Sequence, residues 1–170
     1  MKFTFTHQIK LEELNKTTDK RKGKIAITPF EVKDRYTNYP KCLEDGFISE
    51  EYAFVNVRDL TLIYSRLTLI SIRLLSIIIN KLPINSNICK FRLAEFNNIF
   101  SSAVKHQFDE YLEPLVRNNI IIRTNRKCTY IINHNMFFKG DLNRFAKEYK
   151  EIYGNRKVEY NEKGRVIIDG

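Results

Sequence analysis

SSAVKHQFDEYLEPLVRNNIIIRTNRKCTYIIN, residues 101–133, is the stretch of the sequence that decides the fold. Its first half has the helical period of 3.6 residues, with apolar side chains along one face. These side chains are Val104, Phe108, Tyr111, Leu112, Leu115 and Val116. The hydroxyls of Ser101 and Ser102 suit the start of a helix, and Asn118–Asn119 suit its end. The sequence therefore predicts an amphipathic helix between these two ends.

Two β-prone runs follow this helix directly, Ile120–Arg123 and Cys128–Ile132, with a polar turn at Thr124–Lys127 between them. A helix that leads into a short hairpin with a basic turn is typical of the second half of a winged helix-turn-helix domain. In such domains the helix enters the DNA major groove, and the hairpin lies beside the phosphates. Pro114 falls within the helical run and removes one backbone hydrogen bond, so we expect a kink near Tyr111–Glu113 or a break at Pro114.

The preceding residues supply the other parts of such a domain. The expected elements are an edge strand at Tyr52–Val57, a short helix at 58–65, an apolar helix at Leu67–Leu82, a strand at Ile88–Phe91 and a second helix at Arg92–Ile99. Asn56 or Asp59 can start the short helix, and Leu93, Phe96 and Ile99 are expected to face inward. The helix at Leu67–Leu82 is apolar over much of its circumference, so we expect burial on more than one side. It is either the central helix of the core, which is the favoured reading, or half of a dimer interface.

The ends of the chain are less regular. Residues 25–39 show no clear period and are expected to be irregular or a short strand. After residue 133, a segment rich in large apolar groups is expected to fold back on the core, and Asp141 can cap a helix that ends at Gly154. Residues 155–170 are expected to form a hairpin around Asn161–Gly164; an engineered or frayed tail is the alternative. We therefore expect an α+β, mainly α, winged helix-turn-helix fold with an arm at 1–46, the domain at 47–140, and a C-terminal helix and tail at 141–170.

The net charge of +9 is unevenly distributed. Residues 1–41 have ten basic and five acidic side chains, whereas residues 42–88 have four and five. Residues 89–133 have seven and four, and residues 134–170 have eight and six. The excess on the arm and on the helix-plus-hairpin unit favours a polyanionic partner, of which nucleic acid is the commonest. Ordinary solubility is the alternative explanation of the charge.

Other classes of site find little support in the sequence. Cys42, Cys89 and Cys128 are isolated, show no zinc-binding spacing and suit reduced thiols in a bacterial cytoplasm. The longest apolar run is too short to cross a membrane easily and contains Arg73, and the N-terminus lacks the core of a signal peptide. His7, His106 and His134 are far apart, and phosphate-binding and hydrolase motifs are missing. We expect no enzyme activity, no metal and no cofactor.

Several short motifs resemble one known family. The residues that carry the resemblance are Phe54-Val55-Asn56 at the start of a helix, the run 73–87, and Tyr130-Ile131-Ile132-Asn133 followed by Phe138-Lys139-Gly140-Asp141. They are similar to the RepL-type plasmid replication proteins of Firmicutes, over about residues 47–145. His134 stands where that family usually has proline, which leaves the turn less rigid. The resemblance implies a role in initiating or maintaining plasmid replication, with copy control, by binding origin DNA.

The expected DNA contacts divide into two groups. On the polar face of the predicted helix, base contacts are expected from Ser101, Ser102, Lys105, His106 and Asp109. Phosphate or minor-groove contacts are expected from the hairpin, at Arg123, Asn125, Arg126 and Lys127, and from Lys90 and Arg92 before the second helix. The alternative is that these are the solvated side of a helix and a charged turn.

The expected function is sequence-specific binding of double-stranded DNA at a plasmid origin, by a dimer on repeated or palindromic sites. Such a protein would recruit host replication proteins or open adjacent DNA without chemistry of its own. A transcriptional regulator with the same fold is one alternative. A winged-helix module that binds protein and not DNA is another.

Overall fold

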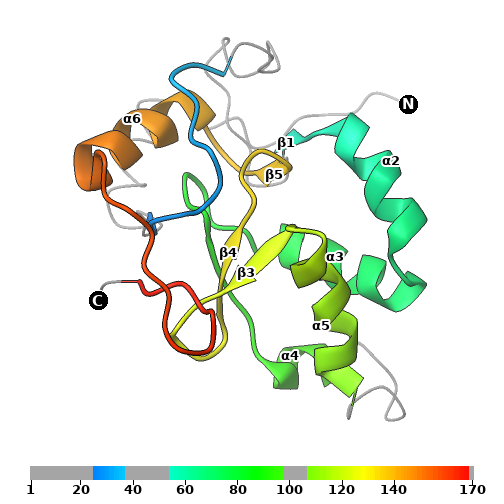
Figure 1. Ribbon diagram of the computed structural model, residues 1–170. Helices are drawn as coiled ribbons and strands as arrows, with labels where there is room; N and C mark the ends of the chain where they lie inside the picture. The colour runs from blue at the N-terminus through cyan, green and yellow to red at the C-terminus, as the bar shows by residue number, and fades with distance from the viewer. Residues whose placement is uncertain (1–24, 37–53, 98–106, 169–170) are drawn as a thin grey trace, which may run out of the picture.

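The computed structural model describes residues 25–36, 54–97 and 107–168, which form an α+β fold (Figure 1). The helices are α2 (Val57–Arg66), α3 (Leu69–Asn80), α4 (Leu93–Asn97), α5 (Phe108–Arg117) and α6 (Leu142–Tyr153). The strands are β1 (Phe54–Val55), β2 (Ile88–Lys90), β3 (Ile121–Arg123), β4 (Thr129–Ile132) and β5 (Phe137–Phe138). Among the described residues, no helix combines the length and the apolar character needed to cross a membrane.

The strands form two small antiparallel sheets. The larger one has the order β2-β4-β3, with Cys89 opposite Tyr130 and Arg123 opposite Tyr130 on the other side of β4. The hairpin expected from the sequence at 120–132 is thereby confirmed, as is the strand at 88–91. In the smaller sheet β1 pairs with β5, which returns the segment after residue 133 to the start of α2, as expected.

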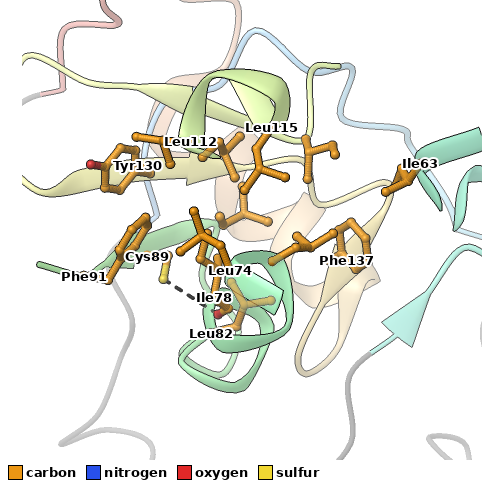
Figure 2. Packing of buried hydrophobic residues seen from close by; sticks show 14 of the residues in the cluster. Ile63, Leu74, Ile78, Leu82, Cys89, Phe91, Leu112, Leu115, Tyr130 and Phe137 are labelled. Atoms are coloured by element: carbon orange, nitrogen blue, oxygen red, sulfur yellow. Dashed lines mark hydrogen bonds between the residues drawn. The ribbon is translucent and has the colours of Figure 1, made fainter. Parts of the chain in front are cut away.

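One face of the larger sheet packs on α3 and α5. Figure 2 shows side chains from both helices meeting those of the sheet, among them Leu74, Ile78, Leu112, Leu115 and Tyr130. Leu115 and Ile78 are fully buried. Because Cβ atoms alternate across a strand, Ile121 and Ile132 face this helical layer, whereas Ile122 and Ile131 face the opposite side.

The burial of Cys89 in this core has a chemical consequence. It raises the pKa of the Cys89 thiol to about 12 and keeps the thiol protonated.

The opposite face of the sheet is covered by segments from both ends of the described chain. Ala26 and Ile27 lie with Val166 and Ile168 against Ile131 of β4. The hydrogen bonds of a buried side chain fix residues 25–27: the amide oxygen of Asn87 accepts from the backbone N–H of Ala26 at 2.9 Å, and its Nδ2 donates to the Ala26 carbonyl at 2.9 Å. One asparagine side chain thus provides the two bonds that a neighbouring strand would otherwise provide.

Helix α6 packs on the remainder of the N-terminal segment (Figure 1). Tyr149 and Tyr153 reach across to its backbone: the Tyr153 hydroxyl donates to the Ile25 carbonyl at 2.8 Å, and the Thr28 N–H donates to the Tyr149 hydroxyl at 3.2 Å. Lys150 forms an ion pair with Asp34. Residues 25–36 therefore follow an irregular path, as expected, and are fixed by contacts distant in the sequence.

The helix termini have the capping residues that the sequence predicts. The side chain of Asn56 accepts from the N–H of Arg58 at the start of α2. The carboxylate of Asp141 accepts from Asn143 and Arg144 at the start of α6, and Gly154 ends that helix with φ +51°. The predicted ends of α2 and α6 are thereby confirmed.

The tripeptide Lys139-Gly140-Asp141 has a structural explanation. The buried Lys139 Nζ donates to the carbonyl of Asn80 at 2.9 Å, at the C-terminal end of α3 where carbonyls lack helical partners. Gly140 has φ +105°, and a Cβ on it would collide with the side chain of Asn85. The same Asn85 side chain accepts from the Asp141 N–H at 2.8 Å. This tripeptide therefore connects the end of α3 to the start of α6.

Two expectations about the helices are wrong. Helix α5 continues through Pro114 to Arg117, so of the two alternatives expected there the break is wrong. Leu93 was expected to face inward but is 42% exposed, at the start of the short helix α4. Helix α3 is a helix of the core, as favoured, because half-buried side chains on both sides of its buried stripe also pack against the core, whereas Leu69 and Arg73 are exposed.

Residues 155–168 pack against the larger sheet. Tyr160 and Val166 pair as an antiparallel bridge around a turn at Asn161–Gly164, so the expected hairpin is confirmed for this part of the chain. Val166 is fully buried and Ile168 is 5% exposed. The alternative of a frayed tail is therefore wrong for residues 155–168.

His134 is fully buried where the N-terminal segment meets α6. Its ring packs among Phe30, Tyr36 and Phe145, and its Nε2 donates to the Glu31 carbonyl at 3.2 Å. Nδ1 has no hydrogen-bond partner within the described part of the chain. Burial lowers the pKa of His134 to about 4, with the hydrogen bond to Glu31 opposing the shift.

This environment predicts acid sensitivity. The unfolded chain takes up a proton at this histidine below a pKa of about 6.5, whereas the folded protein does so only near 4. The free energy of unfolding should therefore fall as the pH drops from about 6.5 to about 4, by up to roughly 3 kcal/mol. Urea denaturation at several pH values should show this fall in the wild type and a shallower one in His134→Gln. Parallel curves for the two proteins would contradict the prediction.

Candidate nucleic-acid interface

The turn between β3 and β4, residues 124–128, has a fixed backbone. Thr124 is buried, and its hydroxyl donates to the Thr129 carbonyl at 2.8 Å and accepts from the Arg126 N–H at 3.2 Å. The hydroxyl of Thr129 donates to the Lys127 carbonyl at 3.2 Å, and Cys128 has the left-handed φ of +57°. Basic side chains in this turn thus extend from a backbone that the protein itself holds in place.

Four basic residues surround this end of the sheet. Arg126 and Lys127 belong to the turn, and the N–H of Phe91 donates to the Cys128 carbonyl at 3.1 Å, which brings the end of β2 alongside. Lys90 and Arg92 flank Phe91 and are exposed, whereas Phe91 is buried and stacks on Tyr130 with ring centroids 4.5 Å apart. Within residues 25–36, 54–97 and 107–168, none of the four forms an ion pair.

Arg123 behaves differently from these four residues. It lies on the face of β3 that points to α5, where its guanidinium contacts Asp109 at 3.3 Å and Glu113 at 3.2 Å. The Arg123 side chain is 29% exposed and that of Glu113 38%, so this pair is partly shielded from water, whereas the pair with Asp109, 88% exposed, is screened. Asp109 and Arg123, both expected to contact DNA, are thus bonded to each other and connect α5 to the hairpin.

Asn125 is exposed at the turn, as expected, but part of it already has a partner. Its N–H donates to the Val166 carbonyl at 2.8 Å, and its side-chain oxygen accepts from the Ile168 N–H at 3.1 Å. The C-terminal segment therefore lies along the outer edge of β3. The sequence predicted the C-terminal hairpin but not this position, because backbone pairing between distant segments leaves no periodic pattern.

The start of the predicted base-reading helix lies outside the described residues. This applies to Ser101, Ser102, Lys105 and His106, since α5 is described from Phe108 with Gln107 before it. In the described part of α5, Asp109 and Glu110 are exposed and acidic. Positive contacts to bases would therefore come from the residues before α5.

Within the three described ranges, no group of three or more histidine, cysteine, aspartate or glutamate side chains is placed to hold a metal ion. Cys89 and Cys128 are unpaired thiols, and Cys89 is buried. What the arrangement can do is bind anions through exposed cations on a fixed backbone.

The chain matches no protein-family model, no curated protein and no solved structure in the comparisons with known proteins.

The role of Thr124 in the turn can be tested by removing its hydroxyl. Thr124→Val keeps the size of the side chain but leaves the Thr129 carbonyl and the Arg126 N–H without this partner, which should lower the free energy of unfolding by about 1–3 kcal/mol. Thr124→Ser keeps the hydroxyl and loses one methyl group, so its loss should be about 1 kcal/mol. Urea denaturation measures both. A valine variant as stable as the serine variant would show that the hydroxyl does not hold the turn.

Proposed function

We propose that the protein binds double-stranded DNA as a winged helix-turn-helix and acts at the origin of a plasmid, as the RepL-type resemblance implies. The observation that carries the proposal is a group of four cations at one end of the sheet, three of them exposed and Arg126 half-buried, none of which forms an ion pair with another described residue. These are Lys90, Arg92, Arg126 and Lys127. Nucleic-acid phosphates are the polyanion that such a group most commonly binds.

The order of elements supports the winged-helix part of the proposal. Helix α3, strand β2, helix α4, helix α5 and the β3–β4 hairpin follow one another in the order that such a domain requires. The sheet order β2-β4-β3 and the packing of α3 and α5 on one face agree with it. In this proposal α5 is the end of the recognition helix, and the hairpin is the wing.

The roles of the residues follow from their positions. Arg126 and Lys127 contact phosphates from the turn, and Lys90 and Arg92 do so from the neighbouring strand end. Lys105 and His106, just before α5, donate to base edges in the major groove. Arg123 holds α5 against the hairpin through Asp109 and Glu113, so that helix and turn reach the duplex in one fixed arrangement. No bond is made or broken by the protein in this mechanism.

A second candidate is a protein-binding role, which exposed apolar side chains favour. Tyr64 on α2 is 55% exposed and Leu69 at the start of α3 is 64% exposed. Exposed apolar side chains mark protein-binding sites where several of them form one patch. In the DNA-binding proposal, these side chains contact a second copy of the chain or a host replication protein. In the alternative, binding a protein through them is the only function.

A transcriptional regulator would differ only in the DNA site. A footprint at an origin or at a promoter distinguishes the two roles.

Binding to DNA should depend steeply on salt. Each phosphate contact releases counterions, so Arg126→Ala and Lys127→Ala should each flatten the plot of log affinity against log salt by about 1. Fluorescence anisotropy with a duplex at several salt concentrations measures the slope. Lys147→Ala is the matched control, because Lys147 is an exposed cation on α6, which Figure 1 shows far from the β3–β4 turn. Failure of the wild type to bind any duplex at low salt would sink the DNA-binding proposal in favour of protein binding.

Sequence reading is tested separately at the residue before α5. Lys105→Ala should reduce the preference for origin fragments of the parent replicon over random duplex, by about 1–3 kcal/mol if one base contact is lost. Lys127→Ala should weaken both duplexes alike, because phosphates carry no sequence information. Competition anisotropy with the two duplexes gives the ratio of affinities. An unchanged ratio in Lys105→Ala would remove this residue from base recognition.

A further inference from the structure

The C-terminal segment is bonded to the outer edge of the hairpin. The Val166 N–H donates to the Arg123 carbonyl at 3.1 Å, and the Val166 carbonyl accepts from Asn125 at 2.8 Å, so that Val166 and Thr124 form a parallel bridge. On its other side Val166 pairs with Tyr160. Figure 1 shows the C-terminal loop beside the turn that joins β3 to β4. The segment thus extends the sheet beyond β3 and ends in a second turn.

This second turn, Asn161–Gly164, is held by one side chain. The amide oxygen of Asn161 accepts from the N–H groups of Lys163 and Arg165, each at 3.0 Å. The backbone of Asn161 accepts from Gly164 and donates to Arg165, both at 2.9 Å. Gly164 has φ +66° with open space around it, so the turn requires glycine for its backbone conformation and not for room. The backbone of this turn is therefore fixed, like that of the β3–β4 turn.

The base of the second turn is anchored in the core. Val166 and Ile168 are buried with Ile131 of the central strand and with Ala26 and Ile27 of the N-terminal segment. Lys163 and Arg165 are exposed and, among the described residues, form no ion pair. Two more cations thus lie on a segment that is bonded to the outer edge of β3.

Arg165 is also on the side of the sheet that faces α5. Val166 is paired with the edge of β3 and packs with Ile131 on the opposite face, so the alternation of side chains along the segment places Arg165 on the other face. Tyr130 belongs to the face of β4 that packs with α5. Arg165 therefore lies on the same side as the helix that the proposed function assigns to the major groove.

We propose that the C-terminal turn is a second phosphate-binding loop, in which Lys163 and Arg165 contact DNA next to the phosphates bound by Arg126 and Lys127. The inference rests on the proposed function and adds a second region of the protein that contacts DNA. The loop also carries Glu159 and Glu162, both exposed, so its net charge is close to neutral and the contact depends on which side chains face the duplex. Because the loop carries both charges, removing a cation and removing an anion should change the affinity for DNA in opposite directions.

The experiment compares neighbours of opposite charge in the full-length protein. Lys163→Ala and Arg165→Ala should each lower affinity for duplex DNA and flatten the salt slope by about 1. Glu162→Ala, one residue away, should raise affinity at low salt because it removes a negative charge near the phosphates. A merely structural role of the loop would not give opposite signs for Glu162 and Lys163. Urea denaturation of each variant confirms that the fold is intact, and Lys147→Ala again provides the distant control.

The outcomes separate the inference from the function on which it rests. If Lys127→Ala weakens binding while Lys163→Ala, Arg165→Ala and Glu162→Ala all bind like the wild type, the proposed function stands and the second loop is overturned. A change of the same sign in Lys163→Ala and Glu162→Ala would also overturn it. If the wild type binds no DNA at low salt, the proposed function itself fails.

Discussion

Strand β4 is buried at every residue, and the rest of the structure depends on the way its two faces are covered. Tyr130 and Ile132 pack toward α3 and α5, whereas Ile131 packs toward segments from both ends of the described chain. A strand with one exposed face could have left those segments free. Here the burial of Ile131 requires Ala26, Ile27, Val166 and Ile168 to cover it. The N-terminal and C-terminal segments therefore contribute to the core.

Much of this architecture follows from local sequence. The 3.6-residue period of α5, the β-branched runs of β3 and β4, and the capping residues Asn56 and Asp141 each act within a few residues of the chain, and the structure has all of them. Helix α5 does not break at Pro114 because tertiary packing holds it: Leu112 and Leu115 on either side of the proline are buried, and this burial outweighs one missing hydrogen bond.

The remaining features could not be read locally. The path of residues 25–27 depends on Asn87, and the position of the C-terminal segment depends on Asn125, two polar residues that in a sequence look like ordinary turn residues. For Leu93, helical spacing predicts burial, but the side chain is 42% exposed. For the candidate site, composition and the hairpin predicted where the cations of the β3–β4 turn would gather. They did not predict Lys163 and Arg165 on a segment that is bonded to the outer edge of β3.

The alternation of side chains along β3 also decides which arginine is available to a partner. Arg123 lies within the paired part of the strand and on the helical face, so it meets Asp109 and Glu113 and its charge is neutralised within the protein. Arg126 lies beyond the last pair of the ladder, where no carboxylate of the described chain reaches it. Two arginines three residues apart thus have different roles: one fixes the helix to the hairpin, and the other remains for an external anion. Because Arg123 holds α5 in place, the position of Arg126 relative to α5 depends on Arg123.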